Sequence, residues 1–452
     1  MHFEISRPTL SRRIASLGDA VVIIGKTSST TYAARDDNAS ELPLYAINEA
    51  GKPAHLGTLI PLARGEWFLQ SNDKIATLFH AEFKDGLYPG WPWFLADLRP
   101  SGFLGRAFAR QLAQSLSFDD HPENWSDGNV AQAISMFGTN LQGNLVVGER
   151  ALDKLLNHGH TRIIRSAEND FSELANCALQ SGAEFGSSAG GEQPKFTSYV
   201  ENRLGPRHVI VKFSPPIDQP TGRRWADLLI AEHIANQVLS ANGIACAQTH
   251  IHEIDGRIFL ESERFDRIGP TGRRGLVSLR ALDAAFVGQG SGSWIKCAQR
   301  LTTAKLITAE DRERITQLWC FGNLIANTDR HFGNLSFYLE KAFPAKLAPC
   351  YDMLPMLFRP AASGEIPQVE FQPKRPLPEH EATWQQILPL ALEFWHQLSN
   401  ESRISKAFQV IAGRNEEALQ ELKVLEASES SPKTSPFFKS AKTTKAKATS
   451  TF

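Results

Sequence analysis

Hydrophobic and polar positions divide the chain into strand-like and helix-like regions. From about Glu41, short apolar stretches are separated by Gly, Pro and Asn, which is typical of β-strands joined by turns. Apolar residues then recur at helical spacing from about Gly105 and again from Ala151 to Gly182. A second strand-like region runs from about Ser187 to Phe265, and the chain past Ala281 is mainly helical. The pattern predicts an α+β protein.

A short helix is predicted near the N-terminus. Ser6 is typical of a helix N-cap, Leu10, Ile14 and Leu17 recur at helical spacing, and Gly18 can end the helix. The segments AVVIIG and TTYAA that follow predict two short strands around a polar turn. A helix followed by a β-hairpin resembles the second half of a winged helix-turn-helix domain.

That resemblance implies a DNA contact through Arg7, Arg12 and Arg13, which lie on the polar side of the helix. A small capped helix with solvated arginines explains the same pattern. The sequence does not supply the earlier helices of such a domain. We therefore expect either that the protein lacks them or that its start codon is misassigned.

Composition limits the class of protein. The 452 residues carry a net charge of −1, so a role on nucleic acid or membrane would need a local patch. The five cysteines are widely spaced and form no C-x-x-C pair, which argues against a disulfide framework or a zinc site and favours a reducing compartment. The first residues contain no apolar signal segment, and no apolar run is long enough to cross a bilayer. These features predict a cytoplasmic protein with no membrane partner.

The segment SSAGGEQPKF, residues 187–196, is a candidate phosphate loop. Gly190 and Gly191 allow the backbone to bend where a Cβ would clash, and Lys195 follows them. An ordinary tight turn has the same composition. The segment is not a Walker A loop, because G-x-x-x-x-G-K-[ST] is absent.

A lysine and a glutamate form a second candidate. In RHVIVKFSP, Lys212 lies near the end of a predicted strand, like the nucleotide-binding lysine of protein kinases. In the predicted helix from Trp225 to Ala241, Glu232 falls inside the apolar stripe, where a carboxylate needs a partner. Lys212 is such a partner, because kinases pair their strand lysine with a helix glutamate. Alternatively, Lys212 is an ordinary edge-strand lysine and Glu232 lies at the wet end of the stripe.

The segment NTDRHFGNLSF, residues 327–337, carries the third candidate. Asp329 and Asn334 have the Asp-x4-Asn spacing of a kinase catalytic loop, between a predicted helix and a predicted strand. Asp352 follows a short apolar run further on, where a second metal-binding Asp would lie. Carboxylate and amide oxygens are ligands that Mg²⁺ prefers. Each of these segments alone could be a turn, but the order lysine, glutamate, Asp-x4-Asn, Asp is that of a kinase.

From roughly Glu41 to Glu426 the chain resembles the HipA family of serine/threonine kinases, the toxins of bacterial toxin–antitoxin systems. The segments that carry the resemblance are SSAGGEQPKF, VIVKF, ESERFDR, NTDRHFGN and CYDMLP. The resemblance implies a bilobal kinase-like fold, ATP and Mg²⁺ as cofactors, transfer of the γ-phosphoryl group to a protein Ser or Thr, and a helix-turn-helix antitoxin as a partner. The phosphate loop here departs from the usual pattern of the family, because GGEQPK carries one extra residue and a proline before its lysine.

The resemblance also implies a role for individual residues. It implies that phosphate is bound by Ala189, Gly190, Gly191, Lys195 and Lys212, that Glu232 supports Lys212, and that adenine is contacted by Glu263, Arg264 and Phe265. It further implies that the nucleotide is bound by His331, Asn334, Tyr351 and Asp352, and that Asn334 and Asp352 also bind the metal. The implied catalytic residue is Asp329, and the implied site of autophosphorylation is Ser187.

The expected organisation has five regions. They are a partial winged helix-turn-helix at 1–35, a β-rich subdomain at 36–155, a small lobe with the Gly-rich loop at 156–265, a helical lobe with the catalytic and metal-binding loops at 266–426, and a disordered basic tail at 427–452.

Two other functions remain open, because the Asp-x4-Asn spacing does not specify the acceptor. One is a small-molecule or lipid kinase, and the other is a DNA-binding regulator with an inactive kinase core.

Overall fold

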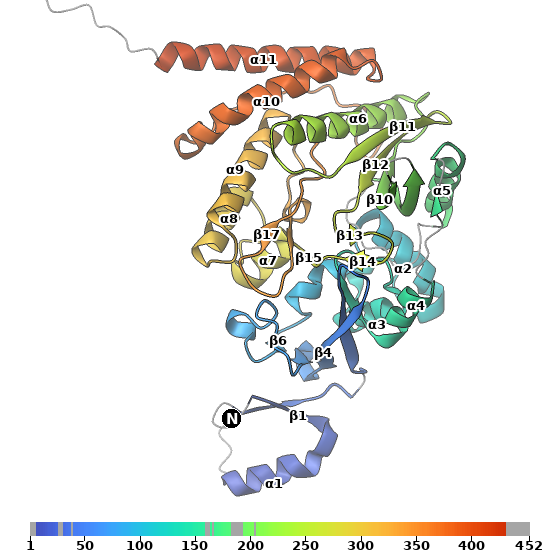
Figure 1. The fold of residues 1–452 in the computed structure, drawn as a ribbon, viewed down its shortest axis with the longest axis vertical. Helices are drawn as coiled ribbons and strands as arrows, with labels where there is room; N and C mark the ends of the chain where they lie inside the picture. Colours follow the sequence, from blue (N-terminus) through green and yellow to red (C-terminus); the bar gives the residue numbers. More distant parts are fainter. Residues whose placement is uncertain are drawn as a thin grey trace, which may run out of the picture.

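The computed structural model describes residues 6–430, except 26–29, 38, 159–162, 165–166, 182–192 and 203–204. Near the N-terminus, helix α1 (Arg7–Leu17) begins after Ser6, whose Oγ accepts a hydrogen bond from Thr9 N, and ends at Gly18, as predicted. Strands β1 (Val21–Ile24) and β2 (Thr31–Ala34) form the predicted antiparallel hairpin. The helix and hairpin project from one end of the molecule (Figure 1).

Among the described residues of this N-terminal unit, those that join a core belong to the hairpin. Val22 and Ile24 pack against Ile60, Leu62 and Phe68 of the next sheet. The helical spacing in α1 predicted the helix but not burial, because 44% of Leu10 and 55% of Leu17 remain exposed.

The strand-like region after Glu41 forms a five-stranded antiparallel sheet in the order β6-β5-β4-β3-β7. The strands are β3 (Leu42–Ile47), β4 (Pro53–Pro61), β5 (Trp67–Gln70), β6 (Leu87–Tyr88) and β7 (Leu145–Val147). Helices α3 (Asp127–Phe137) and α4 (Glu149–His158) pack against this sheet, whereas α2 (Gly102–Leu116) contacts a strand of the second sheet, β9 (Lys195–Asn202). In Figure 1 this unit lies between the N-terminal hairpin and the rest of the molecule.

A second five-stranded sheet, in the order β11-β12-β10-β9-β8, forms the small lobe. Its strands are β8 (Ile163–Ile164), β9 (Lys195–Asn202), β10 (Gly205–Phe213), β11 (Thr249–Ile254) and β12 (Arg257–Glu263), and α5 (Ala167–Ser181) accompanies it. Helix α6 (Pro220–Ala241) begins before the predicted Trp225, because Pro220 suits the first turn of a helix.

Helix α6 is buried on nearly every side rather than along a single stripe. One side packs on β11 and β12 and another on α10 (Glu381–Asn400), so the helix lies between the small lobe and the helical lobe. Trp225, placed in the predicted stripe, stays partly exposed. The period of the apolar residues could not predict this, because packing on two sides removes the contrast between faces.

The large lobe consists of helices around a small sheet. Its further helices are α7 (Leu279–Phe286), α8 (Trp294–Thr303), α9 (Ala309–Leu324) and α11 (Lys406–Ser430). Its strands are the ribbon β13 (Arg267–Ile268) and β14 (Gly272–Arg273), and the sheet β15 (Leu276–Ser278), β16 (Ser336–Tyr338) and β17 (Lys346–Leu347). Helix α11 continues to Ser430, beyond the boundary expected at Glu426, and residues 431–452 of the predicted tail lie outside the described residues.

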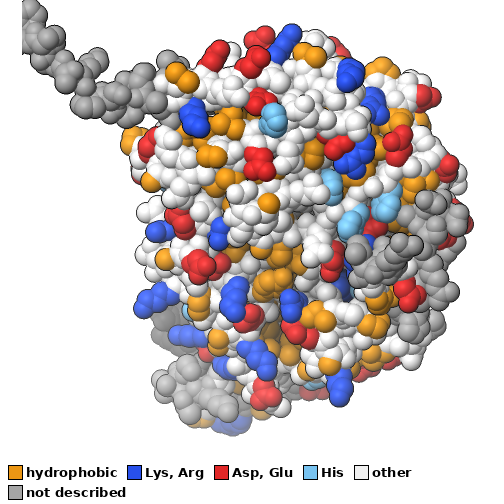
Figure 2. Space-filling view, turned by 45° about the horizontal axis from the view of Figure 1, so that its top comes forward, with side chains coloured by type: hydrophobic (Ala, Val, Ile, Leu, Met, Phe, Trp, Pro, Cys, Tyr) orange, Lys and Arg blue, Asp and Glu red, His pale blue; other side chains and the backbone are white. Residues whose placement is uncertain are grey.

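The surface agrees with a chain of net charge −1. On the face in Figure 2, basic and acidic side chains are interspersed, with apolar side chains between them. In the part of the chain that the structure describes, no helix has both the length and the apolar character needed to traverse a bilayer.

Candidate active site

The ion pair indicated by the position of Glu232 is present. Val209, Val211 and Phe213 point to one side of β10 and join the core beneath the small-lobe sheet, so Lys212 points to the other side, toward α6. There its Nζ donates hydrogen bonds to Glu232 Oε1 at 2.6 Å and to Oε2 at 2.7 Å. Only 1% of Glu232 is exposed, which rules out a position at the wet end of the stripe.

Asp352 completes this cluster, a contact that the sequence did not indicate. Lys212 Nζ also donates a hydrogen bond to Asp352 Oδ1. The segment before Asp352 is held against the segment that follows α6, because Cys350 N donates to Ala245 O at 2.8 Å and Ala247 N donates to Cys350 O at 2.9 Å. Asp352 itself has φ +55°, in the left-handed region that non-glycine residues seldom adopt and that is frequent at functional sites.

Burial and the neighbouring charges together set the pKa values of Lys212, Glu232 and Asp352. Burial disfavours the charged form of Lys212, but Asp352 and Glu232 outweigh burial and raise the pKa of the ammonium. Burial likewise opposes ionisation of Asp352, but Lys212 and Lys195 outweigh it and lower the pKa of that carboxyl. Burial dominates at Glu232 and raises its pKa. Lys212 is therefore charged, and Asp352 is the more strongly ionised of its two partners.

Lys195 lies beside Lys212. The two residues are direct partners in the register of β9 and β10, and Lys195 is only 3% exposed. Both ammonium groups favour the ionised form of Asp352, and lysines placed together in this way can bind phosphate oxygens. The other predicted phosphate-loop residues cannot be placed, because they lie outside the described residues: Ser187, Ala189, Gly190 and Gly191.

The loop that carries Asp329 explains the five-residue interval to Asn334. Asn334 Nδ2 donates a hydrogen bond to Asp329 O at 2.7 Å, and Asn334 N donates to His331 O at 3.1 Å. Since Nδ2 is engaged, Oδ1 of Asn334 remains as an acceptor. No described residue hydrogen-bonds the partly exposed Asp329 carboxylate, which leaves it available to a ligand.

Asn327, which the sequence interpretation missed, connects the two loops. Its side chain is 2% exposed, its Oδ1 accepts from Asp329 N at 3.0 Å, and its Nδ2 donates to Asp352 O at 3.4 Å. Arg330 strengthens the same turn, because its guanidinium donates to Asn327 O and lies 4.6 Å from the centroid of the Trp319 ring. The letters NTDR carried a signal for this, since Asn commonly accepts a backbone bond two residues later.

Aromatic residues connect the loop that carries Asp329 to the segment that follows β12. Tyr351 donates its hydroxyl to Gly333 O at 2.8 Å, and its ring lies 5.9 Å from that of Phe265. The Tyr351 hydroxyl therefore holds the loop between His331 and Asn334 in place, and the Tyr351 ring packs beside Phe265 of the predicted adenine-binding segment.

The segment of Glu263 and Arg264 is largely engaged within the protein. Glu263 N donates to Gln248 O at 2.8 Å, and Arg264 N donates to His208 O at 2.9 Å. The Arg264 guanidinium forms a buried ion pair with Asp266, with Nη2 2.9 Å from Oδ2. The Arg264 carbonyl accepts a hydrogen bond from Arg267 N at 3.1 Å, so a nucleotide contact by Arg264 would use the second lone pair of that oxygen.

The donor set fits a magnesium ion that also binds phosphate. Among the described residues, no group of three or more His, Cys, Asp or Glu side chains could hold a metal by itself. Mg²⁺ needs only one or two carboxylates when phosphate oxygens and water supply its other ligands. Asp352, which is 26% exposed at its side chain, and the acceptor Oδ1 of Asn334 meet that requirement.

Two protein-family models match successive parts of the chain. Residues 38–156 match the family described as YjjJ-like toxin, middle domain, and residues 187–420 match the family described as HipA-like C-terminal domain. Toxin YjjJ of Escherichia coli (strain K12) is 37% identical over 423 residues, which cover 92% of this chain and 93% of that protein.

Two solved structures were compared with this chain, and the HipA structure, at low sequence identity, shows the same fold. HipA of Shewanella oneidensis MR-1, solved with HipB and operator DNA, has a TM-score of 0.50 and 15% identity, and the match covers 84% of this chain and 96% of that one. The proinflammatory kinase CtkA of Helicobacter pylori has a TM-score of 0.38 and 12% identity, over 54% of this chain and 94% of that one.

Proposed function

Because the chain belongs to the HipA family of toxins and has the predicted bilobal α+β kinase-like fold, we propose that it is an ATP- and Mg²⁺-dependent kinase for Ser or Thr residues of a protein. The observation that supports this most directly is the contact of Lys212 with both Glu232 and Asp352. Three residues from a strand, a helix and a loop meet at one ammonium, and they follow each other along the chain in the order of a kinase.

Each residue has a distinct part in the proposed reaction. Lys212, oriented by Glu232, and Lys195 bind phosphate oxygens, and Asp352 and Asn334 would hold Mg²⁺. The ion, when bound, neutralises charge that develops on the transferred phosphoryl group. Asp329 accepts a hydrogen bond from the acceptor hydroxyl, orients it and takes its proton.

Nucleotide binding and transfer are tested separately. Isothermal titration with ATP should show binding in the presence of Mg²⁺ and a large loss of affinity in EDTA. Labelled ATP with cell extract should then give a labelled product of protein size. Absence of ATP binding under both conditions would refute the kinase function, while a small labelled product would identify a small-molecule or lipid kinase.

We also propose a partner and a location. The Shewanella HipA was solved with HipB and operator DNA. By analogy, a small helix-turn-helix antitoxin is the proposed partner here, and the cytoplasm is the proposed location. Co-expression with the product of an adjacent helix-turn-helix gene, followed by affinity purification, tests the partner. If no such complex forms, the DNA role would rest on the N-terminal helix alone.

A further inference from the structure

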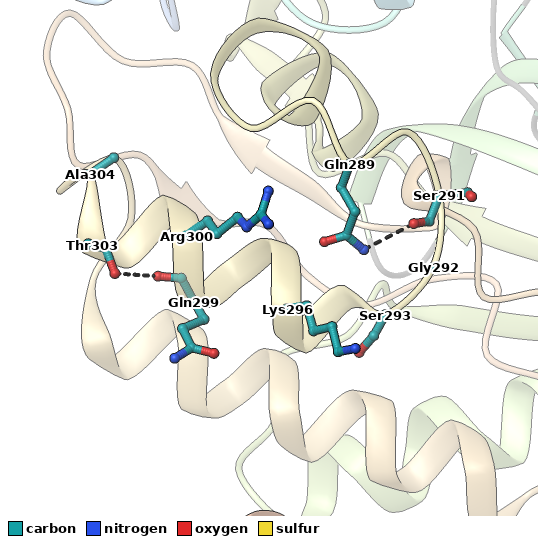
Figure 3. Close-up of a pocket in the computed structure, with 9 residues that line it drawn as sticks. All are labelled: Gln289, Ser291, Gly292, Ser293, Lys296, Gln299, Arg300, Thr303 and Ala304. Carbon is teal, nitrogen blue, oxygen red and sulfur yellow. Dashed lines mark hydrogen bonds between the residues drawn. The ribbon is translucent and has the colours of Figure 1, made fainter.

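An open pocket of about 920 Å³ lies between the loop after α7 and the exposed face of α8 (Figure 3). Lys296 and Arg300 lie one turn apart on α8, and Gln289, Ser291 and Ser293 belong to the facing loop. Figure 3 shows Gln289 and Arg300 extending into the space between loop and helix. None of the nine lining residues is Asp or Glu. The lining therefore carries two positive charges together with neutral hydrogen-bonding groups.

The two cations are available to a ligand. Neither Lys296 nor Arg300 forms an ion pair or a side-chain hydrogen bond with another described residue, and both side chains are exposed. An acidic group of the neighbouring helix α7, Asp283, is 2% exposed and is satisfied internally. It accepts hydrogen bonds from Gln289 N at 3.0 Å and from Gly290 N at 2.7 Å. Asp283 thus fixes the shape of the loop and leaves the charge of Lys296 and Arg300 uncompensated.

The two helices that flank the pocket loop, α7 and α8, are each hydrogen-bonded to the segment that follows Asp329. Leu279 N, at the start of α7, donates to Leu335 O at 2.8 Å. Trp294 Nε1, at the start of α8, donates to His331 O at 3.1 Å. His331 lies two residues from Asp329. The connection between α7 and α8, which forms the pocket, is therefore held in a fixed position relative to the residue proposed to orient the acceptor hydroxyl.

We infer that this pocket binds an acidic segment of the protein acceptor, next to the Ser or Thr that receives the phosphoryl group. The inference rests on the proposed kinase function and adds the chemistry of the substrate. Arginine and lysine bind carboxylates through charge-assisted hydrogen bonds, and hydroxyl and amide groups bind a peptide backbone. None of the nine lining residues is aromatic, so the pocket lacks the stacking surfaces with which proteins bind single-stranded RNA.

The test compares peptide binding to charge variants and requires no turnover. Two fluorescent peptides each contain a central serine, flanked by glutamates in one and by glutamines in the other, and their affinities are measured by anisotropy. Wild-type protein should prefer the glutamate peptide, and Lys296→Ala with Arg300→Ala should reduce its affinity about tenfold, since two exposed ion pairs are lost. The matched control is Arg414→Ala with Lys423→Ala, which removes the same charge from exposed positions on α11 and should keep the preference.

Charge reversal separates this pocket from general electrostatic attraction. Lys296→Glu with Arg300→Glu should transfer the preference to a peptide with flanking lysines, while the melting temperature reports whether the variant remains folded. Three results would each overturn the inference: no glutamate preference in wild type, an equal loss in the α11 control, or tighter pocket-dependent binding of single-stranded RNA than of peptide. The kinase function fails by a different readout, the absence of ATP binding in titration.

Discussion

Replacement of Asp266 by Ala tests the buried connection between the β-rich subdomain and the predicted adenine-binding segment. Asp266 is 4% exposed and accepts hydrogen bonds from Gly143 N at 2.8 Å, Arg264 Nε at 3.0 Å and Arg267 Nη1 at 2.7 Å. Leu141 O accepts a bond from Arg267 Nη2 at 2.6 Å. The carboxylate is therefore the centre of a network that joins the segment before β7 to the segment after β12.

The magnitude follows from what the substitution leaves behind. Removing one member of a buried ion pair costs about 3–5 kcal/mol, because the remaining charge stays buried without its partner. Here Arg264 retains Asn140 Oδ1 and Leu141 O, and Arg267 retains three carbonyl oxygens as partners, which favours the lower end, about 3 kcal/mol. At about 2–4 °C per kcal/mol, the figure for a cooperative unit of roughly 150–250 residues, the melting temperature should fall by about 6–12 °C.

Glu49→Ala provides the matched control. Glu49 pairs with Arg274 between the same two parts of the chain, with 2.8 Å between Oε1 and Nε, but the side chains are 62% and 44% exposed. An exposed pair contributes about 0.2–1 kcal/mol, so thermal scans at pH 7 should show a shift of at most a few degrees. An equal shift in Glu49→Ala and Asp266→Ala would refute the argument that burial makes the difference.

The difference in stability between wild type and Asp266→Ala should also depend on pH. Burial opposes ionisation of Asp266, but Arg264 and Arg267 outweigh it and hold its pKa below the usual range. A depressed folded-state pKa adds stability above the unfolded pKa of about 3.9, and this stability is lost as pH falls through the folded value. The difference between wild type and Asp266→Ala should therefore be constant from pH 5 to pH 8 and should narrow below about pH 4. A difference that grows on acidification would contradict this sign.

Three further predictions concern the candidate active site and the N-terminal helix. Asp329→Asn should lower phosphate transfer about 10²-fold or more with little change in ATP affinity or melting temperature, because its contact forms in the transition state; near-normal transfer would show that the loop is only a turn. Asp352→Ala should lose Mg²⁺-dependent ATP binding as well as transfer, measured by titration with and without EDTA; unchanged Mg²⁺ dependence would exclude Asp352 as a ligand. Arg12→Ala with Arg13→Ala should weaken any DNA gel shift and reduce its salt dependence, because phosphate contacts release counterions; equal binding by wild type and variant would remove these arginines from a DNA contact.

Several features of this fold were accessible from local sequence because their causes are local. The cap at Ser6 and the stop at Gly18 bounded α1 correctly, since capping depends on a few neighbouring residues. The contact of Glu232 with Lys212 was also accessible, because a carboxylate within an apolar helix stripe requires a cationic partner. The roles of these residues in phosphate transfer remain predictions.

Other features depend on contacts between distant segments. The bond of Lys212 to Asp352 joins residues 140 positions apart, and no local pattern specifies that distance. Asn327 acquires its importance only because the Asp352 loop folds against it. The same applies to α6, whose burial on two sides was not visible in a single apolar stripe.

By itself, the sequence determined that a lysine, a glutamate, an Asp-x4-Asn segment and a further Asp follow each other in the order of a kinase. It also determined for most segments whether they form a helix or a strand, since strand alternation, helix spacing and turn residues act over a few positions. Only the tertiary structure decided which charges meet and which remain free. Asp266 is enclosed by two arginines, whereas Lys296 and Arg300 face an open pocket without a carboxylate. The physical reason is that the cost and the strength of a charge depend on its burial and its partners, and chain folding brings those partners from distant positions.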